Sequence, residues 1–172
     1  GHENVSILNG GFKGWANGGN KVATGENSIT PASFKTKLNK KYFASFSEVQ
    51  KAQKGKGQQC LIDARPAAFF TGDKKHAKAR IPGRLANARN LQEGNLIDDS
   101  FKMKPSSAIK SQFGGLDGVE QYKGYISYCN TGHWAATVWF GLSEIAQIPN
   151  VKMYDGGMTH WTSNPKRKVD LG

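Results

Sequence analysis

The stretch YCNTGHWAAT, residues 128–137, contains the residue with the clearest capacity for chemistry, Cys129. This cysteine follows an apolar run and precedes a short polar segment that contains a glycine. A thiolate is a strong nucleophile, and backbone amides or a helix N-terminus stabilise its charge. Free cysteine is also among the most buried residue types, so an ordinary thiol that fills space at the end of a strand is the alternative.

The residues after Cys129 predict a tight loop between a strand and a helix. Such a loop points successive backbone N–H groups into one concavity, and that concavity binds anions. Glycine lets the backbone turn without a Cβ clash, and small polar residues leave room for a ligand. His133 is a donor to an anion, a proton carrier, or simply a half-exposed residue at the start of the helix. We therefore predict Cys129 as the catalytic residue and the following substrate-binding residues around it: Asn130, Thr131, Gly132, His133 and Trp134.

Two chemistries use a cysteine in a loop before a helix. Phosphatases place an arginine six residues after the cysteine, where it grips the phosphate through two hydrogen bonds. Here Ala135 holds that position, and no arginine occurs between Arg89 and Arg167. A phosphatase or an arsenate reductase relative is therefore the weaker hypothesis. An anion-binding loop without arginine suits a smaller group, namely a single sulfur atom that the thiolate carries as a persulfide.

From about residue 42, apolar runs alternate with helical patterns. This alternation predicts an α/β fold in which a parallel sheet of about five strands is covered by helices on both faces. Ligand sites in such sheets lie beyond the carboxyl ends of the strands, where Cys129 stands. The expected elements are strands at 58–64, near 85–88, at 122–129 and at 151–155, and helices at 45–53, 65–73, 105–113 and 133–148.

An internal repeat indicates how the chain is organised. NVSILNGGFKGW at 4–15 aligns without gaps to NVKMYDGGMTHW at 150–161, and Asn, Val, the Gly-Gly pair and Trp coincide. We favour a true duplication over a chance echo in a glycine-rich chain. Residues 1–24 are then expected to be the C-terminal remnant of a preceding, similar domain. Residues 25–41, rich in small and polar side chains, would be a linker, and residues 42–172 would be the catalytic domain.

Composition limits the partners and cofactors. The net charge of +11 indicates a solvated, lysine-rich surface, or attraction of small anions. No nucleic-acid partner is expected, because no stacking aromatics are interleaved with the basic residues and no zinc-finger spacing occurs. Neither a metal nor another cofactor is expected, since the two cysteines and four histidines fit no ligand spacing. Cys60 is assigned to the core. No apolar run approaches the ~18 residues that a membrane span needs.

Four motifs resemble those of the rhodaneses, the thiosulfate and 3-mercaptopyruvate sulfurtransferases, and they occur in the same order. They are LIDARPAAFFTG (61–72), ARIPGRLANARNL (79–91), ISYCNTGHWAA (126–136) and NVKMYDGGMTHW (150–161). Ala79 and Arg80 replace the usual Gly-His of the second motif. The resemblance implies a tandem protein with an inactive first domain and a second domain that carries Cys129. It implies a sulfurtransferase that moves sulfane sulfur from thiosulfate, or from 3-mercaptopyruvate, to cyanide or a thiol through a Cys129 persulfide.

One departure from the family concerns substrate anchoring. Vertebrate members carry a substrate-binding arginine where this chain has Phe69. The anchor must then come from the loop amides, from His133, or from a basic residue such as Arg65 or Arg89. We predict Arg65 as a substrate-binding residue, although the favoured reading of Asp63 and Arg65 is an internal ion pair or a cap for a neighbouring loop.

The resemblance leaves other points open. The neutral residues after the cysteine, together with His133, do not decide between sulfur donors, and Trp134 suggests an apolar wall. The implied partners are a small anionic sulfur donor, a thiol or cyanide acceptor, and the missing first domain. Similar bacterial tandem proteins suggest a periplasmic location, with the cytoplasm as the alternative. A non-catalytic module, whose cradle holds an anion or a partner's tail, is the alternative function.

Overall fold

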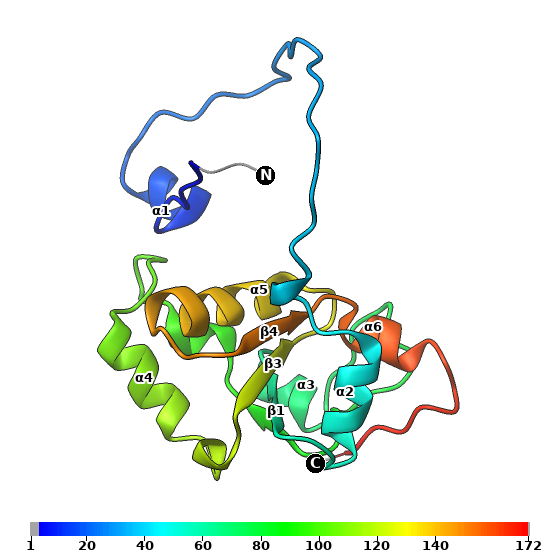
Figure 1. Cartoon of the computed structure of the whole chain (residues 1–172). Coiled ribbons are helices and arrows are strands. Elements are labelled where there is room, and N and C mark those ends of the chain that lie inside the picture. Colours follow the sequence, from blue (N-terminus) through cyan, green and yellow to red (C-terminus); the bar gives the residue numbers. More distant parts are fainter. Residues whose placement is uncertain (1–3, 172) are drawn as a thin grey trace.

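A four-stranded parallel sheet forms the centre of the protein (Figure 1), in a computed structural model that describes residues 4–171. The strand order is β2-β1-β3-β4, and every pairing is parallel. The strands are β1 (Gln59–Asp63), β2 (Ala88–Asn90), β3 (Gly124–Tyr128) and β4 (Val151–Tyr154). The expected parallel α/β fold is confirmed, but the described sheet has four strands rather than about five.

The strand expected near 85–88 is displaced toward the C-terminus. Asn87 has a φ of 62°. A non-glycine residue in this left-handed region interrupts an extended backbone, so β2 begins only at Ala88 and is three residues long.

Helices flank the sheet on both faces (Figure 1). Ser45 starts α2 with a capping box, in which its hydroxyl accepts the Glu48 N–H while the Glu48 side chain accepts the Ser45 N–H. The helices are α1 (Gly11–Asn17), α2 (Phe46–Gln53), α3 (Ala67–Phe70), α4 (Ser106–Gly114), α5 (His133–Phe140) and α6 (Gly157–Thr162), and the 3₁₀ turns are η1 (Lys40–Tyr42), η2 (Glu93–Leu96) and η3 (Val119–Gln121).

The segment expected as one helix at 133–148 divides into two parts. The α-helix α5 ends at Phe140, and a π-helical turn, η4 (Gly141–Ile145), follows. A Cβ on Gly141 would stand 3.1 Å from Leu96. The glycine therefore lets this turn approach the neighbouring core closely, where a larger residue would crowd it.

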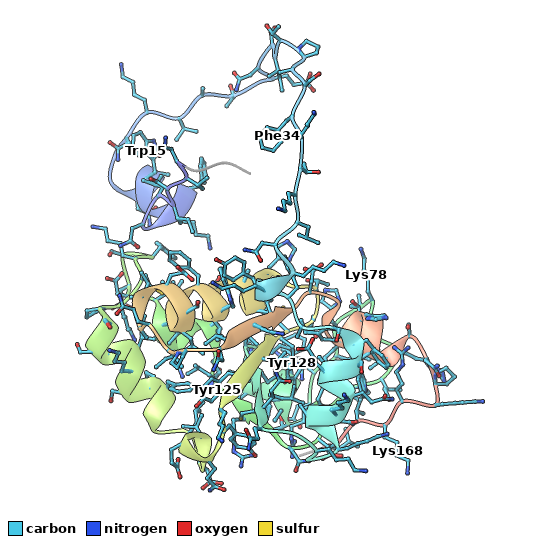
Figure 2. All side chains as sticks on the ribbon, viewed as in Figure 1. Trp15, Phe34, Lys78, Tyr125, Tyr128 and Lys168 are labelled. Carbon is cyan, nitrogen blue, oxygen red and sulfur yellow. The ribbon has the colours of Figure 1, made fainter. Side chains whose placement is uncertain are left out.

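Successive side chains of a strand point to opposite faces of the sheet and belong to two separate hydrophobic cores. Cys60 and Ile62 of β1 belong to the core beneath α4 and α5, whereas Leu61 belongs to the core beneath α2 and α6. The same alternation places Tyr125 and Tyr128 of β3 in different cores (Figure 2). Because β1 and β3 are buried on both faces, their central residues read in sequence as largely apolar runs.

The N-terminal segment lies apart from this two-sided core (Figure 1). It contains α1 and is joined to η1 by an extended stretch, residues 20–39, without regular secondary structure. The Met103 N–H donates to Asn9 Oδ1 at 2.8 Å, and the Lys13 ammonium lies 5.3 Å from the centre of the Phe101 ring. These contacts place the segment against the loop before α4. Among residues 4–171, no helix combines the length and apolarity needed to cross a bilayer.

Candidate active site

Cys129 follows β3 directly, at the carboxyl edge of the sheet. The backbone N–H of Gly132 donates to Cys129 Sγ across 3.1 Å. The residue is only 1% exposed and belongs to the apolar core under α4 and α5. The sulfur therefore faces the loop backbone, as expected for a nucleophile in a cradle, but it lies deeper than the sequence indicated.

Gly132 forms the turn between the sulfur and the helix. Its φ of 96° is in the left-handed region, which favours glycine. Its carbonyl accepts the N–H of Ala136 at 2.8 Å, which starts α5. The N-terminus of this helix carries about half a positive elementary charge. Negative charge on Sγ is therefore stabilised by one direct amide contact and by the dipole of the following helix.

The start of α6 holds the other side of the Cys129 loop. The N–H of Met158 donates to the Cys129 carbonyl at 2.8 Å, and the N–H of Thr159 donates to the Asn130 carbonyl at 3.2 Å. Gly157, with a φ of 53°, allows this approach. The Gly-Gly pair belongs to the internal repeat, but nothing local to it indicates that it holds the cysteine loop in place.

Gly157→Ala is expected to lower the free energy of unfolding by about 2–4 kcal/mol, because the new Cβ would clash and the backbone would be strained. That Cβ would stand 2.5 Å from the Cys129 carbonyl oxygen and 2.6 Å from that of Asn130. Urea denaturation measures the effect. Gly55→Ala is the matched control, since Gly55 has a φ of 65° but only the Asn87 side chain near it, at 3.8 Å. Equal losses in the two variants would show that the carbonyl contacts are irrelevant.

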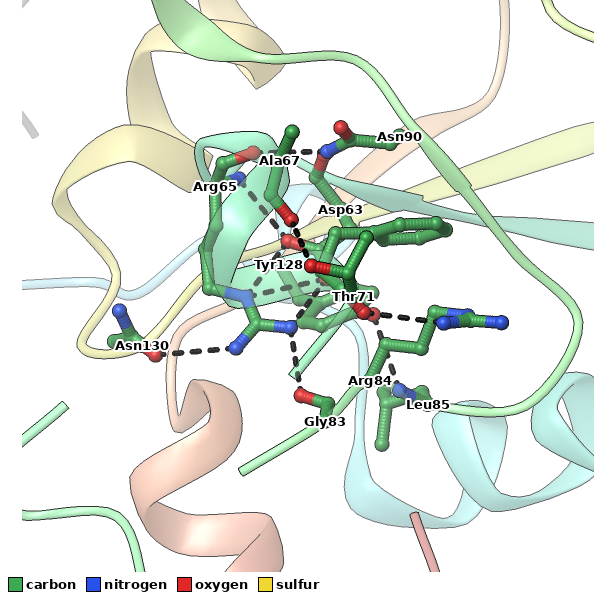
Figure 3. A network of polar contacts seen from close by, with 11 residues as sticks. Asp63, Arg65, Ala67, Thr71, Gly83, Arg84, Leu85, Asn90, Tyr128 and Asn130 are labelled. Atoms are coloured by element: carbon green, nitrogen blue, oxygen red, sulfur yellow. Dashed lines mark hydrogen bonds and ion pairs between the residues drawn. The ribbon is translucent and has the colours of Figure 1, made fainter. Parts of the chain in front are cut away.

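A buried ion pair lies beneath the loop (Figure 3). Arg65 Nη2 stands 2.6 Å from Asp63 Oδ2, and Arg65 Nε donates to Asp63 Oδ1 at 2.9 Å. Arg65 Nη2 also donates to the Gly83 carbonyl at 2.9 Å, and Arg65 Nη1 donates to Asn130 Oδ1 at 3.4 Å. The internal ion pair favoured from the sequence is therefore present. The predicted role of Arg65 in substrate binding stays a prediction, and the contact with Asn130 links Arg65 to the loop.

Charges in this network reinforce one another. Burial by itself would lower the pKa of Arg65, but the hydrogen bonds and charge of Asp63 outweigh it and hold that pKa above its usual value. Burial, followed by the negative charge of Asp63, raises the pKa of Tyr128 well above 10. Arg65 therefore stays a cation and Tyr128 a neutral phenol, whose oxygen accepts the N–H of Leu85 at 3.2 Å.

The structure brings the predicted loop residues together but gives them different surroundings. Asn130 is 2% exposed and points inward, and its Nδ2 has no hydrogen-bond partner among the described residues. Thr131 Oγ1 lies 3.3 Å from Nδ1 of His133, which is exposed. Asn130 therefore connects the loop to the core, whereas Thr131 and His133 are on the side that a substrate can reach.

Trp134 forms an aromatic wall with Phe69 of α3. The two ring centres lie 6.0 Å apart in an edge-to-face arrangement, and both side chains are half-buried. Arg89, considered as an anchor from the sequence, instead donates through Nε to the Asp117 carbonyl. Apolar surface therefore lies beside the cysteine loop at Phe69 and Trp134.

Cys60 differs from Cys129 in its surroundings. It is 1% exposed on β1, and burial raises the pKa of its thiol to about 11, although the charge of Arg89 opposes this. Its assignment to the core is confirmed. Within the described part of the chain, no three His, Cys, Asp or Glu side chains gather as possible metal ligands.

Comparisons with known proteins agree with this geometry. The family model described as rhodanese-like domain matches residues 45–164. A 3-mercaptopyruvate sulfurtransferase from Escherichia coli (strain K12) is 30% identical over 171 residues, covering 99% of this chain and 59% of that protein. A thiosulfate sulfurtransferase from Gallus gallus is 30% identical over 174 residues, covering 98% of this chain and 58% of that protein.

Solved structures share the fold. An anaerobic ergothioneine biosynthesis enzyme from Chlorobium limicola superposes with a TM-score of 0.80 at 18% identity, over 99% of this chain and 42% of that one. The Tum1 protein from Saccharomyces cerevisiae gives a TM-score of 0.61 at 23% identity, over 76% of this chain and 47% of that one. The present chain spans only 52% to 59% of the length of three curated relatives that it matches, among them the Escherichia coli protein.

Proposed function

Because the chain belongs to the rhodanese-like domain family, we propose that it is a sulfurtransferase in which Cys129 carries sulfane sulfur as a persulfide. The donor would be thiosulfate or a related compound, such as 3-mercaptopyruvate, and the acceptor would be cyanide or a thiol. The observation that carries this proposal is the Gly132 N–H that donates to Cys129 Sγ at the start of α5. This contact stabilises the negative charge of the Cys129 thiolate, and the dipole of α5 favours the charge that the outer sulfur of the persulfide carries.

The reaction divides into two displacements. The Cys129 thiolate attacks the outer sulfur of thiosulfate, the S–S bond of the donor breaks, and sulfite leaves with the electron pair. Cyanide then attacks the outer sulfur of the Cys129 persulfide, thiocyanate leaves, and the thiolate returns. Charge and atoms balance in both steps, and neither step needs an oxidant or a reductant. The covalent intermediate makes this a ping-pong scheme.

The loop suits sulfur better than phosphate. Ala135, which stands where a phosphatase has its arginine, is buried, and its carbonyl accepts the Ser127 hydroxyl at 3.0 Å. A phosphate dianion would lack the paired hydrogen bonds of a guanidinium at this position. A persulfide carries a single charge, which the amide and the helix dipole can balance.

Steady-state kinetics test the proposal. Thiosulfate and cyanide are varied together, and thiocyanate is measured. The covalent scheme predicts parallel lines in double-reciprocal plots, because each substrate meets a different form of the enzyme. Intersecting lines, or no thiocyanate above the rate of the uncatalysed reaction, would contradict it.

The deep position of Cys129 supports a second candidate function. At 1% exposure, the sulfur is nearly closed off in this conformation. A module of this kind could hold an anion or a partner's tail at Thr131 and His133 without any covalent step. The discriminating sign is a Cys129 that iodoacetamide fails to alkylate at neutral pH while the protein remains folded.

We also propose that residues 4–17 are the closing strand and helix of another rhodanese-like module. In the second copy of the repeat, the side chains at the aligned positions are 1% to 5% exposed; in the first copy, their exposures run from 43% to 71%. Gly11 and Gly157, which align, have φ values of 55° and 53°. The aligned core pairs are Val5 with Val151, Leu8 with Tyr154, Phe12 with Met158, and Trp15 with Trp161.

Trp15 provides the test of this second module (Figure 2). It is 43% exposed, and its Nε1 donates to the Lys21 carbonyl, much as Trp161 Nε1 donates to the Lys168 carbonyl. In a longer chain that contains the rest of the module, we expect the fluorescence emission of Trp15 to shift to the blue, because burial removes water from the indole. Trp15→Phe in both chains isolates its signal. Emission that does not differ between the chains would contradict the assignment.

A further inference from the structure

The surroundings of Cys129 contain a feature that bears on the choice of sulfur donor. Trp134 lies in the first turn of α5 and packs against the same core as Cys129. Phe69 meets it edge to face, with 6.0 Å between the ring centres. Both rings are half-buried and so present apolar surface beside the loop.

Three arginines, Arg65, Arg84 and Arg89, already have partners. The charge of Arg65 is balanced by Asp63, and the residue is 2% exposed. Arg84 Nη1 donates to the Phe70 carbonyl, and its guanidinium lies 4.5 Å from the centre of the Phe70 ring. Arg89 donates to the Asp117 carbonyl. A small dianion that approaches Phe69 and Trp134 would lose hydration without gaining a guanidinium partner from these three arginines, which is costly.

We infer that the site prefers sulfur donors whose leaving group carries an apolar or aromatic body over the small dianion thiosulfate. This inference rests on the proposed persulfide function. The aromatic body would lie against Phe69 and Trp134, where ring contacts add to the apolar area removed from water. The sulfane sulfur itself would still approach Cys129 Sγ and the Gly132 N–H.

Benzenethiosulfonate is the probe, because it delivers the same outer sulfur as thiosulfate from a leaving group with a phenyl ring. The Cys129 thiolate attacks its outer sulfur, the donor S–S bond breaks, and benzenesulfinate leaves with the electron pair. The two reactants and the two products carry the same total charge, and the step needs no oxidant or reductant. Any difference in the intrinsic reactivity of the two donors cancels when the ratio of their kcat/KM values is compared between variants.

Trp134→Ala and Phe69→Ala are each expected to lower the benzenethiosulfonate-to-thiosulfate ratio of kcat/KM by about fivefold, mainly through the KM of benzenethiosulfonate. Trp134→Phe keeps an aromatic face and should retain most of the ratio. Phe69→Arg should lower the ratio further by favouring thiosulfate, since a guanidinium pairs with the dianion. Phe43→Ala is the matched control, because Phe43 is 37% exposed and lies on the segment that bridges to Met153 of β4.

The outcomes separate this inference from the proposed function. If both alanine variants keep the ratio of the unchanged protein, or lose activity equally with both donors, the aromatic wall does not select the donor, and the inference is overturned while the persulfide function stands. If neither donor loads sulfur onto Cys129 in the unchanged protein, the proposed function itself fails and the inference fails with it.

Discussion

Cys129→Ser is expected to reduce thiocyanate formation to the background rate, a loss of at least about 10³-fold. A serine hydroxyl at this position cannot form the S–S bond that holds the transferred sulfur. The variant should fold normally, because the oxygen can still accept the N–H of Gly132. Circular dichroism and urea denaturation establish the fold, and a discontinuous thiocyanate assay measures the rate.

Cys60→Ala is the matched control for that loss. Cys60 is buried in the same core, with a thiol pKa raised to about 11, so it is almost entirely protonated at neutral pH. Its removal should leave the transfer rate within about twofold, with a modest loss of stability from the small cavity. Transfer that survives in Cys129→Ser and disappears in Cys60→Ala would assign the nucleophile to the other cysteine.

Arg65→Met is expected to lower the free energy of unfolding by about 3–5 kcal/mol, because it leaves the Asp63 carboxylate buried without its partner. Asp63 is fully buried, and its carboxylate would lose the three hydrogen bonds that the guanidinium donates. The loop should also loosen, since Asn130 Oδ1 loses its donor. Chemical denaturation measures the stability, and the KM of the donor reports on the loop.

Two further variants identify the cause. Combining Asp63→Asn with Arg65→Met removes both charges. The asparagine Oδ1 can still accept the backbone N–H of residue 65, so the double variant should recover most of the stability. Lys152→Met breaks the half-exposed pair of Lys152 with Glu48, whose side chains are 30% and 31% exposed, and should cost about 1 kcal/mol or less. A similar cost for Arg65→Met and Lys152→Met would show that burial of the ion pair is unimportant.

The central strands and the position of Cys129 could be predicted because they depend on local patterns. A parallel strand that is buried on both faces reads as a largely apolar run, and the central strands β1 and β3 do so. Helix α2 begins at a serine with glutamate three residues later, which is a local capping signal. Cys129 lies at a carboxyl end simply because it follows such a run.

Features that depend on distant partners could not be predicted. Residues 5–8 repeat the pattern of β4 but form no strand in the described chain, because a strand requires a neighbour to accept its hydrogen bonds, and β4 has β3. Nothing local to Asn130 shows that it turns inward to Arg65, 65 residues away in sequence. The π-helical turn at Gly141 likewise reflects a close approach to Leu96.

The most direct test is to locate the transferred sulfur by mass spectrometry of peptides after the protein is incubated with benzenethiosulfonate or thiosulfate. We predict a gain of one sulfur atom on the peptide that contains Cys129, no gain on the peptide that contains Cys60, and complete loss of the added sulfur after cyanide. An unmodified Cys129 peptide in folded protein exposed to either donor would contradict the proposal that this thiol is the sulfur carrier.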